Sequence, residues 1–307
     1  MPMIRRRRQV ALKIESVEGT AETLAAADAT MLVWDPKVDL DTPHFDREPA
    51  RASMSNHAGV SGTRSGTITF RVEVRGSGTA TTAPSWESAL RCCGTVGTTT
   101  TKIDYNPISA SIPSCTIGLY ADGKRYLFAG CRGNVRLVGT VGEPVMFEFS
   151  FKGKLTSHAD AALLGSITYE TTVPPPLLNA AFSIQGLSAK VSKFEIDIGN
   201  ELTLRTDISD VTGFASCLIT KRKPTIKIDP EVETDAVHDF LDKLFTDVTG
   251  TLTMTIGSTA GNKIVVTAPA VQYSEADDGE REGNDIYDLT AMLTLSSADD
   301  EVRFSHQ

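Results

Sequence analysis

Residues 67–75 read Thr67-Ile-Thr-Phe-Arg-Val-Glu-Val-Arg75, and apolar and polar side chains alternate along them without a break. Successive side chains of a strand point to opposite faces of a sheet, so this pattern predicts a strand with one buried face. A second strict alternation, Val145-Met-Phe-Glu-Phe-Ser-Phe151, predicts a partner strand. Between them, Thr116–Phe128 contains two apolar runs joined by Asp122-Gly123, a strong hairpin signal. This half of the chain is therefore predicted to be an antiparallel sheet.

A short helix is predicted between the first strand and the hairpin. Pro84 suits the first position of a helix over residues 84–91, because that position needs no backbone N–H donor. Trp86, Ala89 and Leu90 form its apolar stripe. We expect Trp86 and Leu90 to pack this helix against the sheet.

The composition also favours strands. The chain has 307 residues, of which 36 are threonine, a branched residue that suits strands better than helix interiors. Hydrophobic residues make up 40% and charged residues 22%, as in a globular protein. No apolar run is long enough for a membrane-spanning helix, so no membrane partner is expected. The five cysteines lack C-x-x-C spacing and are expected to be buried reduced thiols.

The second half of the chain repeats the order of elements in the first. Strands are predicted at the positions 225–229, 251–256, 264–267 and 288–295. A helix is predicted over Thr234–Asp247, because apolar residues recur there at three- and four-residue spacing. Phe240 and Leu244 belong to its packing face, whereas His238 falls on its polar face and is expected to be solvated.

A tandem duplication is the simplest interpretation of this order. The hairpin at Gly123 aligns with one at Gly261, and the first half carries a longer segment over residues 94–113. A proline-rich linker, residues 173–179, separates the halves. The expected fold is mainly β (α+β), with two tandem β-sandwich or barrel-like domains, residues 1–172 and 180–307, each flanked by one short α-helix.

Each half also contains a long polar segment. Residues 36–62 and 199–223 precede the strand that leads to the helix, and both exceed the usual length of a loop in a compact domain. Such segments are flexible surface loops or arms that contact a neighbouring subunit. Contacts with neighbouring subunits are expected from these arms and from the basic N-terminus, at Arg5, Arg6, Arg7, Arg8, Leu40, Phe45, Arg47, Leu204, Ile208 and Phe214.

Charge is distributed unevenly along the chain. Residues 1–170 hold 19 Lys+Arg and 17 Asp+Glu, whereas residues 171–307 hold 11 and 22, and the net charge is −9. The acidic second half argues against tight binding of nucleic acid, which requires contacts from Lys and Arg to phosphate. The basic N-terminus is not followed by the apolar run of a secretory signal, so synthesis in the cytoplasm is expected.

Catalytic motifs are absent from the sequence. None of the five histidines lies in H-E-x-x-H, and neither G-x-S-x-G nor a phosphate-binding G-x-x-x-x-G-K loop occurs. The acidic run Glu275–Glu282 could suggest calcium, but its spacing does not match an EF-hand loop, and a solvated acidic hairpin is favoured. We expect no enzyme activity, no metal site and no cofactor.

One composite pattern resembles a known family. Residues 73–94 read Glu73-Val-Arg-Gly-Ser-Gly-Thr-Ala-Thr-Thr-Ala-Pro-Ser-Trp-Glu-Ser-Ala-Leu-Arg-Cys-Cys-Gly94, a strand, a Gly-Ser-Gly-Thr turn and an Ala-Pro helix start. This stretch, the opening Lys13–Thr20 and the region Asp46–Glu48 resemble the major tail tube proteins of bacteriophages with long, non-contractile tails. The resemblance covers residues 10–155.

The resemblance implies a structural virion protein. Tube subunits of that family form rings in which strands join into one barrel around a lumen, the rings stack, and a long loop reaches the adjacent ring. The genome passes through the lumen during ejection without specific binding. The implied partners are further copies of the chain and other tail proteins (tape measure, terminator and tail tip). The implied location is the virion tail, after synthesis in the cytoplasm of the host bacterium.

The number of chains in a ring and the function itself each keep an alternative at the level of sequence, and a separate hypothesis concerns charge. A duplicated chain could form a ring from three copies with pseudo-sixfold symmetry, which we favour, or from six copies with the second half as an outer decoration. Acidic side chains on lumen-facing strands would repel DNA. A carbohydrate-binding or adhesin-like β-sandwich is the alternative function, although Trp34 and Trp86 fall on a predicted strand and helix rather than on binding loops.

Overall fold

The computed structural model describes residues 3–307 and is mainly β, with 50% of the chain in strands and 6% in helices. Its strands are β1 (Arg8–Ile14), β2 (Val33–Asp41), β3 (His44–Phe45), β4 (Val60–Ser61), β5 (Ser65–Glu73), β6 (Thr95–Thr99), β7 (Ile103–Pro107), β8 (Cys115–Ala121), β9 (Gly123–Thr140), β10 (Met146–Ala161), β11 (Ala181–Ile184), β12 (Lys193–Asp197), β13 (Asn200–Thr206), β14 (Phe214–Arg222), β15 (Thr225–Ile228), β16 (Thr249–Ile256), β17 (Ile264–Arg281), β18 (Asn284–Thr294) and β19 (Arg303–His306). Its helices are the 3-10 turn η1 (Ala26–Ala29), α1 (Glu87–Arg91), α2 (Asp235–His238) and α3 (Phe240–Phe245). The predicted fold class is confirmed.

The same pairing order occurs in both halves of the chain. In the first, β2 pairs with β5, β5 with β10, β10 with β9, β9 with β8, and β8 with β1. In the second, the pairing order is the same: β12 pairs with β15, β15 with β18, β18 with β17, β17 with β16, and β16 with β11. We refer to these two sets as the first and second repeat.

The two repeats form one sheet rather than two separate ones. The last part of β9 pairs with β12, from Arg136 opposite Asp197 to Thr140 opposite Lys193. Eight strands therefore lie edge to edge in the order β2-β5-β10-β9-β12-β15-β18-β17. The hairpin β6–β7, within the longer segment of the first half, joins the other end through β19. The predicted boundary at residues 173–179 stays a prediction, since strands pair across it.

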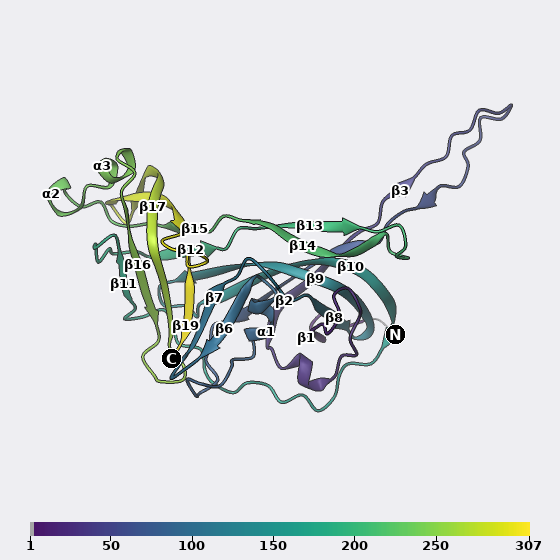
Figure 1. The fold of residues 1–307 in the computed structure, drawn as a ribbon, viewed down its shortest axis with the longest axis horizontal. Coiled ribbons are helices and arrows are strands. Elements are labelled where there is room, and N and C mark those ends of the chain that lie inside the picture. The colour runs from purple at the N-terminus through teal and green to yellow at the C-terminus, as the bar shows by residue number, and fades with distance from the viewer. Residues whose placement is uncertain (1–2) are drawn as a thin grey trace.

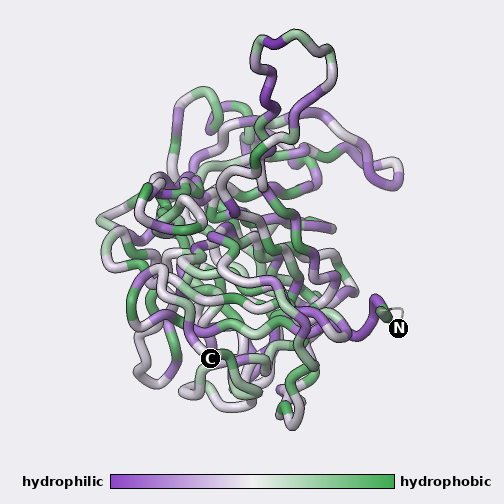
Figure 2. The backbone as a smooth tube through the Cα atoms, turned by 90° about the vertical axis from the view of Figure 1, so that its right-hand side faces the viewer, coloured by the Kyte–Doolittle hydropathy of each residue, from purple (hydrophilic) through white to green (hydrophobic). Residues whose placement is uncertain are grey.

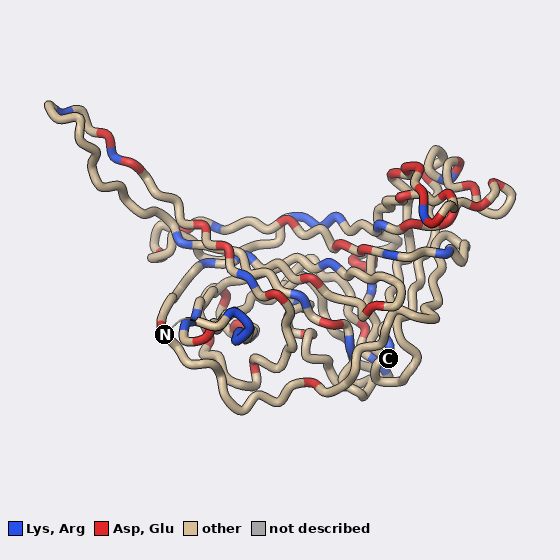
Figure 3. The backbone as a smooth tube through the Cα atoms, turned by 180° about the vertical axis from the view of Figure 1, so that it is seen from behind, with Lys and Arg blue, Asp and Glu red and all other residues tan. Residues whose placement is uncertain are grey.

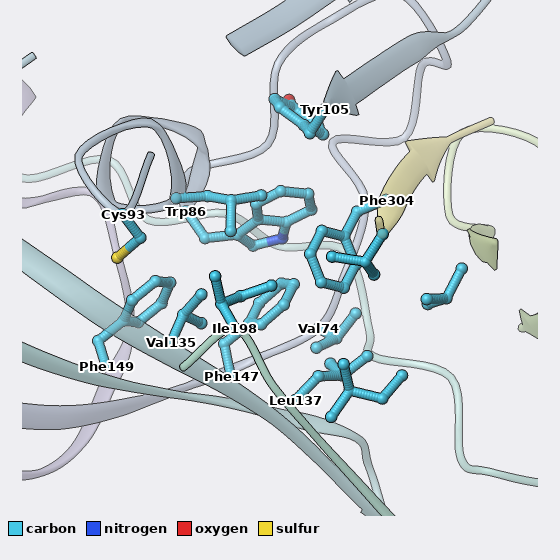
Figure 4. Packing of buried hydrophobic residues seen from close by; sticks show 14 of the residues in the cluster. Val74, Trp86, Cys93, Tyr105, Val135, Leu137, Phe147, Phe149, Ile198 and Phe304 are labelled. Atoms are coloured by element: carbon cyan, nitrogen blue, oxygen red, sulfur yellow. The ribbon is translucent and has the colours of Figure 1, made fainter. Parts of the chain in front are cut away.

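Hairpin turns and a buried aromatic cluster hold the first repeat together. Asp122 and Gly123 both have positive φ, 36° and 108°, as the tight turn between β8 and β9 requires. Trp86 lies just before α1, fully buried, with ring centroids 5.1 Å from Phe147 and 5.3 Å from Tyr105. Its indole N–H donates to the carbonyl oxygen of Arg75 at 2.8 Å. Figure 4 shows Trp86 beside α1, with Phe147 on the side of the sheet and Tyr105 on the other side, and the rings meet at tilted or edge-on angles.

The apolar faces of the strands meet in one core that spans both repeats. It includes Phe147 and Phe149 of β10, Ile196 of β12, Leu289 of β18 and Phe304 of β19, all nearly or fully buried. In Figure 2, hydrophobic and hydrophilic stretches alternate through the body, whereas the N-terminal segment is hydrophilic. Figure 1 shows the body with one hairpin projecting far beyond it. All five cysteines are buried and free, as the sequence predicts.

The helix of the second repeat differs from its prediction. It is broken into α2 and α3 at Asp239, whose backbone is extended. The Asp239 carboxylate accepts from the backbone N–H of Asp242 at 2.7 Å, so it caps a new helix instead of continuing the old one. The break turns His238 inward: it is buried, and its Nε2 lies 3.0 Å from the hydroxyl of Tyr273. The prediction of a solvated His238 is wrong.

The polar segments of both halves contain strands that the sequence pattern missed. Residues 36–41 continue β2, and β3 pairs with β4 within the predicted loop 36–62. Residues 200–222 form the hairpin β13–β14. The apolar residues of these hairpins are either exposed or covered by distant parts of the chain. Their strands therefore lack the pattern of one buried and one exposed face by which a strand is recognised in a sequence.

Replacing Trp86 by Ala should lower the free energy of unfolding by about 3–5 kcal/mol, because it removes a fully buried ring and leaves a cavity. Urea unfolding of the unassembled protein, followed by circular dichroism, measures this loss. Trp34→Ala is the matched control: Trp34 is 50% exposed and leaves no enclosed cavity, so its loss should cost clearly less than that of Trp86. Equal losses for the two variants would contradict the packing role of Trp86.

Candidate assembly surfaces

Two hairpins leave the sheet at equivalent places. Arm 1, residues 42–64, connects β2 to β5, and arm 2, residues 200–222, lies between β12 and β15. Both parent pairs occupy the same place in their repeats. The two arms nevertheless have different surroundings, because arm 2 lies against the first repeat of its own chain whereas arm 1 projects from the body (Figure 1).

Arm 2 fills a gap that we call the first fork. Along one side of β9, β8 pairs up to Cys131 and β12 pairs from Arg136 onward, so the strands diverge between these residues. Asn200, at the root of arm 2, donates from Nδ2 to the carbonyl oxygens of Cys93 at 2.7 Å and Gly133 at 3.0 Å. Its own N–H donates to Asn134 Oδ1 at 2.9 Å. Asn200 of arm 2 thus provides hydrogen-bond donors at the gap between the diverging strands.

Arg132 is the centre of the first fork. Its guanidinium is buried and donates to the carbonyl oxygens of Ile112, at 2.7 Å, and of Cys217 in arm 2. It also forms an ion pair of 3.3 Å with Glu18. The Ser216 hydroxyl of arm 2 donates to the same carboxylate. The hydrogen bond from Arg132 lowers the pKa of Glu18, with burial opposing it and the Ser216 bond adding to it.

The far end of arm 2 is held by a second ion pair. Lys154 Nζ of β10 lies 2.6 Å from Asp210 Oδ2, and the lysine side chain is only 8% exposed. Burial raises the pKa of Asp210, but the bonds from Lys154 and Thr212 outweigh it and lower the pKa to about 2. Arm 2 bends at Gly199, whose φ is +66°. An added Cβ there would lie 2.2 Å from the carbonyl oxygen of Lys223, so the bend requires glycine.

Arm 1 has exposed apolar side chains. Phe45 and Val60 face each other across β3–β4 and are 59% and 52% exposed, and Leu40 at the root is 49% exposed. Met54 near the tip is fully exposed. Large apolar side chains that gather on one projecting hairpin are typical of a surface that another molecule covers.

A second fork lies at the equivalent place in the second repeat. β16 begins at Thr249, opposite Gln272, whereas β17 continues to Arg281. Within residues 3–307, no strand occupies the β16 side of β17 beyond Gln272. The segment leading into this fork exposes Phe245 by 76% and Val248 by 42%. Acidic residues gather around α2, α3 and the β17–β18 hairpin in Figure 3.

The eight-strand sheet has one free edge at each end. In the part of the chain that is described, β2 pairs with β5 alone, and the last part of β17 pairs with β18 alone. These edges correspond to β12 and to the last part of β9, which pair with each other inside the chain. Unpaired edges present rows of backbone donors and acceptors to any further strand.

The face of the sheet that points away from the core is polar and concave. Residues from β5 to β17 line one hollow of about 550 Å³, including Arg71, Glu195, Lys227, Asp288 and Glu275. Charges on this face largely pair with one another. Arg136 lies 2.6 Å from Glu148 and 2.9 Å from Glu195, on neighbouring strands.

The residues predicted for assembly fall into different places. Arg5, Arg6 and Arg7 are exposed; Arg7 lies 2.7 Å from Asp122, and Arg8 within β1 donates to the carbonyl oxygen of Pro36. Leu40, Phe45 and Arg47 are exposed on β2 and arm 1, and Ile208 is exposed at the tip of arm 2. Leu204 and Phe214 are partly buried in arm 2. Trp86, Leu90 and Phe240 are buried, and Leu244 is partly buried against the core.

The residues that the sequence did not predict are the charged ones that hold arm 2. Arg132, Glu18, Lys154 and Asp210 are far apart in the chain, and no spacing rule joins them. Phe245 carried a usable signal, since the apolar stripe of the helix is wider than one packed face needs.

Among residues 3–307, no three His, Cys, Asp or Glu side chains are grouped as metal ligands. No helix of the described chain combines the length and the apolar character that crossing a membrane requires.

Acid should release arm 2 from the first fork. The folded pKa values of Glu18 and Asp210 lie below their ordinary values, so both carboxylates stabilise the fold above pH ~4, and this stability is lost as the pH falls toward 2. Amides of residues 200–222 should therefore lose protection from hydrogen exchange over this range before those of β16 and β17. In Glu18→Gln/Asp210→Asn, protection of arm 2 should be weaker at pH 6 and should change less on acidification. Equal pH dependence in both proteins would contradict this role.

Comparison with known proteins agrees with this geometry. The family model described as phage tail tube protein matches residues 5–293. No curated protein matches the chain. The match includes both arms and all eight strands of the edge-to-edge sheet except the last residue of β18. The chain therefore belongs to the phage tail tube protein family, and its role is that of a structural subunit of the virion tail.

Proposed function

We propose that the chain polymerises into rings that stack into the tail tube and form the channel for genome ejection. The main observation in support of this proposal is the junction inside the chain, where β9 of the first repeat pairs with β12 of the second. The corresponding edges, β17 and β2, are free at opposite ends of the sheet. Pairing β17 of one copy with β2 of the next repeats the internal junction between chains.

This contact is head to tail, because it joins two different surfaces. A head-to-tail contact generates a closed ring when its rotation closes, and an open filament when it does not. Closure removes both free edges, which would otherwise promote aggregation. A ring of eight-strand sheets is therefore the arrangement in which every strand of the sheet has a partner on each side.

Three chains per ring is the proposed number. The shared pairing order supports an ancestral duplication, with residues 1–172 and 180–307 as its two domains and residues 173–179 as the linker. Three chains then provide six repeats with pseudo-sixfold symmetry. Six chains per ring is the alternative.

The concave polar face is proposed to line the lumen. Its Arg136 is compensated by Glu148 and Glu195, so it offers few free cations to phosphate. Glu275 and Asp277 on β17 add negative charge to the rim of the hollow. DNA would pass such a wall without specific binding. The stacked tube would also meet the tape measure, terminator and tail-tip proteins, after synthesis in the host cytoplasm.

Electron cryomicroscopy of the purified, concentrated protein tests the proposal. The expected result is tubes of stacked rings with three chains and a continuous wall of strands per ring. Rings of six chains would contradict the proposed three chains per ring but would still support the tube function. Monomers that stay dispersed at all concentrations and bind glycans would overturn the structural function.

Proline on the free edge of β17 should prevent assembly. Asp277 and Asp278 are both exposed, and the N–H groups of adjacent strand residues point to opposite sides. One of Asp277→Pro and Asp278→Pro thus removes a bond to β18, and the other removes only an outward donor. The variant that keeps the wild-type Tm should form no tubes. Tubes from that variant would contradict edge pairing, and proline at exposed Val173, which lies outside the strands, is the control.

A further inference from the structure

We infer that arm 1 of each chain docks on the second fork of the next chain in the same ring, as arm 2 docks on the first fork within the chain. The inference rests on the proposed ring and identifies the surface that receives the arm. Arm 1 of one chain binds a second copy of this chain, and the receiving surface consists of Phe245, Val248 and the adjoining edge of β17. This docking places the paired strands β3 and β4 of arm 1 on a neighbour within the same ring.

The equivalence of the two arms is the first step. Each arm extends a hairpin, β2–β5 or β12–β15, whose first strand forms an edge of its repeat. Arm 2 overhangs the edge β12 and lies on the repeat that pairs with that edge. Arm 1 overhangs the edge β2 in the same way. The molecule that pairs with β2 is therefore the one on which arm 1 comes to lie.

The equivalence of the two forks is the second step. At the first fork, arm 2 covers the end of α1, where Leu90 and Cys93 are completely buried and Asn200 bonds to the carbonyl oxygen of Cys93. At the second fork, α3 ends at Phe245, in the corresponding place between strands β15 and β16. Phe245 is 76% exposed because nothing in the described chain lies over it. The second fork has the receiving surface without the arm.

Apolar surface on both sides matches. Arm 1 presents Phe45 and Val60 from its paired strands, and Leu40 from its root. The second fork presents Phe245 and Val248, with Leu241 partly open beside them. Covering large apolar side chains stabilises a contact by about 25 cal/mol for each Å² removed from water. Both sets are exposed in the single chain, and each would be covered by the other.

Charge favours the same pairing. Arm 1 contains the three arginines Arg47, Arg51 and Arg64 against two acidic residues. The segment 231–248, which includes α2 and α3, contains six acidic residues and one lysine. Figure 3 shows the acidic end of the molecule opposite the end from which arm 1 projects. One copy cannot bring both surfaces together, so the contact joins two copies.

Cross-linking distinguishes contact within a ring from contact between rings. The native cysteines are buried, and burial raises the pKa of Cys93, Cys115 and Cys131, so they should not react. In Phe45→Cys/Phe245→Cys, both new thiols replace exposed side chains. Assembled tubes of this variant are treated with a flexible bismaleimide and analysed under denaturing conditions. The expected product is a covalent oligomer that stops at the number of chains in one ring, three.

The alternatives give different products. A ladder that extends beyond the ring size would show that arm 1 reaches the adjacent ring, and would overturn the inference while the tube function stands. Intact tubes with uncross-linked chains would overturn it as well. A covalent oligomer that stops at six chains would support the docking of arm 1 and would show that a ring contains six chains rather than three. Failure to form tubes or rings under any condition would overturn both the inference and the proposed function.

A matched control isolates the contact. Val173 is exposed to the same 76% as Phe245 but lies in the proline-rich linker. Phe45→Cys/Val173→Cys should form tubes of the same appearance and stay largely monomeric after treatment. In addition, Phe245→Asp should leave the Tm of the monomer unchanged and raise the concentration needed for assembly at least tenfold. Cross-linking through Val173 equal to that through Phe245 would contradict a specific contact.

Discussion

The backbone pairing of β9 is the constraint on which the rest of the molecule depends. One side of this strand serves two partners, β8 along its first part and β12 along its last. A strand can satisfy two partners on one side only if they diverge, and the divergence leaves unpaired donors and acceptors at the gap. Arg132, Asn134 and arm 2 meet that need at the first fork. The junction therefore unites the repeats and immobilises one of the two arms.

In the proposed assembly, duplication would turn this constraint into a contact between chains. A single repeat has one edge like β2 and one like the end of β9, and two repeats in tandem satisfy one such pair and leave one. The surplus edges lie at opposite ends, together with the surplus arm and the unfilled fork. Strand pairing supplies geometry, since backbone bonds fix register, whereas the apolar contact of Phe45 and Phe245 would supply much of the affinity. In that proposed contact, the acidic end and the arginines of arm 1 would favour the head-to-tail order over other pairings.

Much of the framework was predictable because local rules govern it. Alternation located β5 and β10, the Asp122-Gly123 pair located the turn of β8–β9, and Trp86 was placed on a packed face. Prediction was wrong where a local rule competed with a distant partner. The stripe of residues 234–247 predicted one helix, but the Asp239 cap and the inward hydrogen bond of His238 to Tyr273 broke it.

By itself, the sequence determined the class of the fold, the main strands of the core and the likeness of the two halves, because side-chain periodicity and turn chemistry act over a few residues. The tertiary structure alone decided that the halves share one sheet and that arm 2 is docked while arm 1 is free. It also decided which edges are open. Those outcomes depend on contacts between residues more than a hundred positions apart, such as Glu18 with Arg132. No periodicity records such contacts, because burial and hydrogen bonding at the fork select them only after the strands have paired.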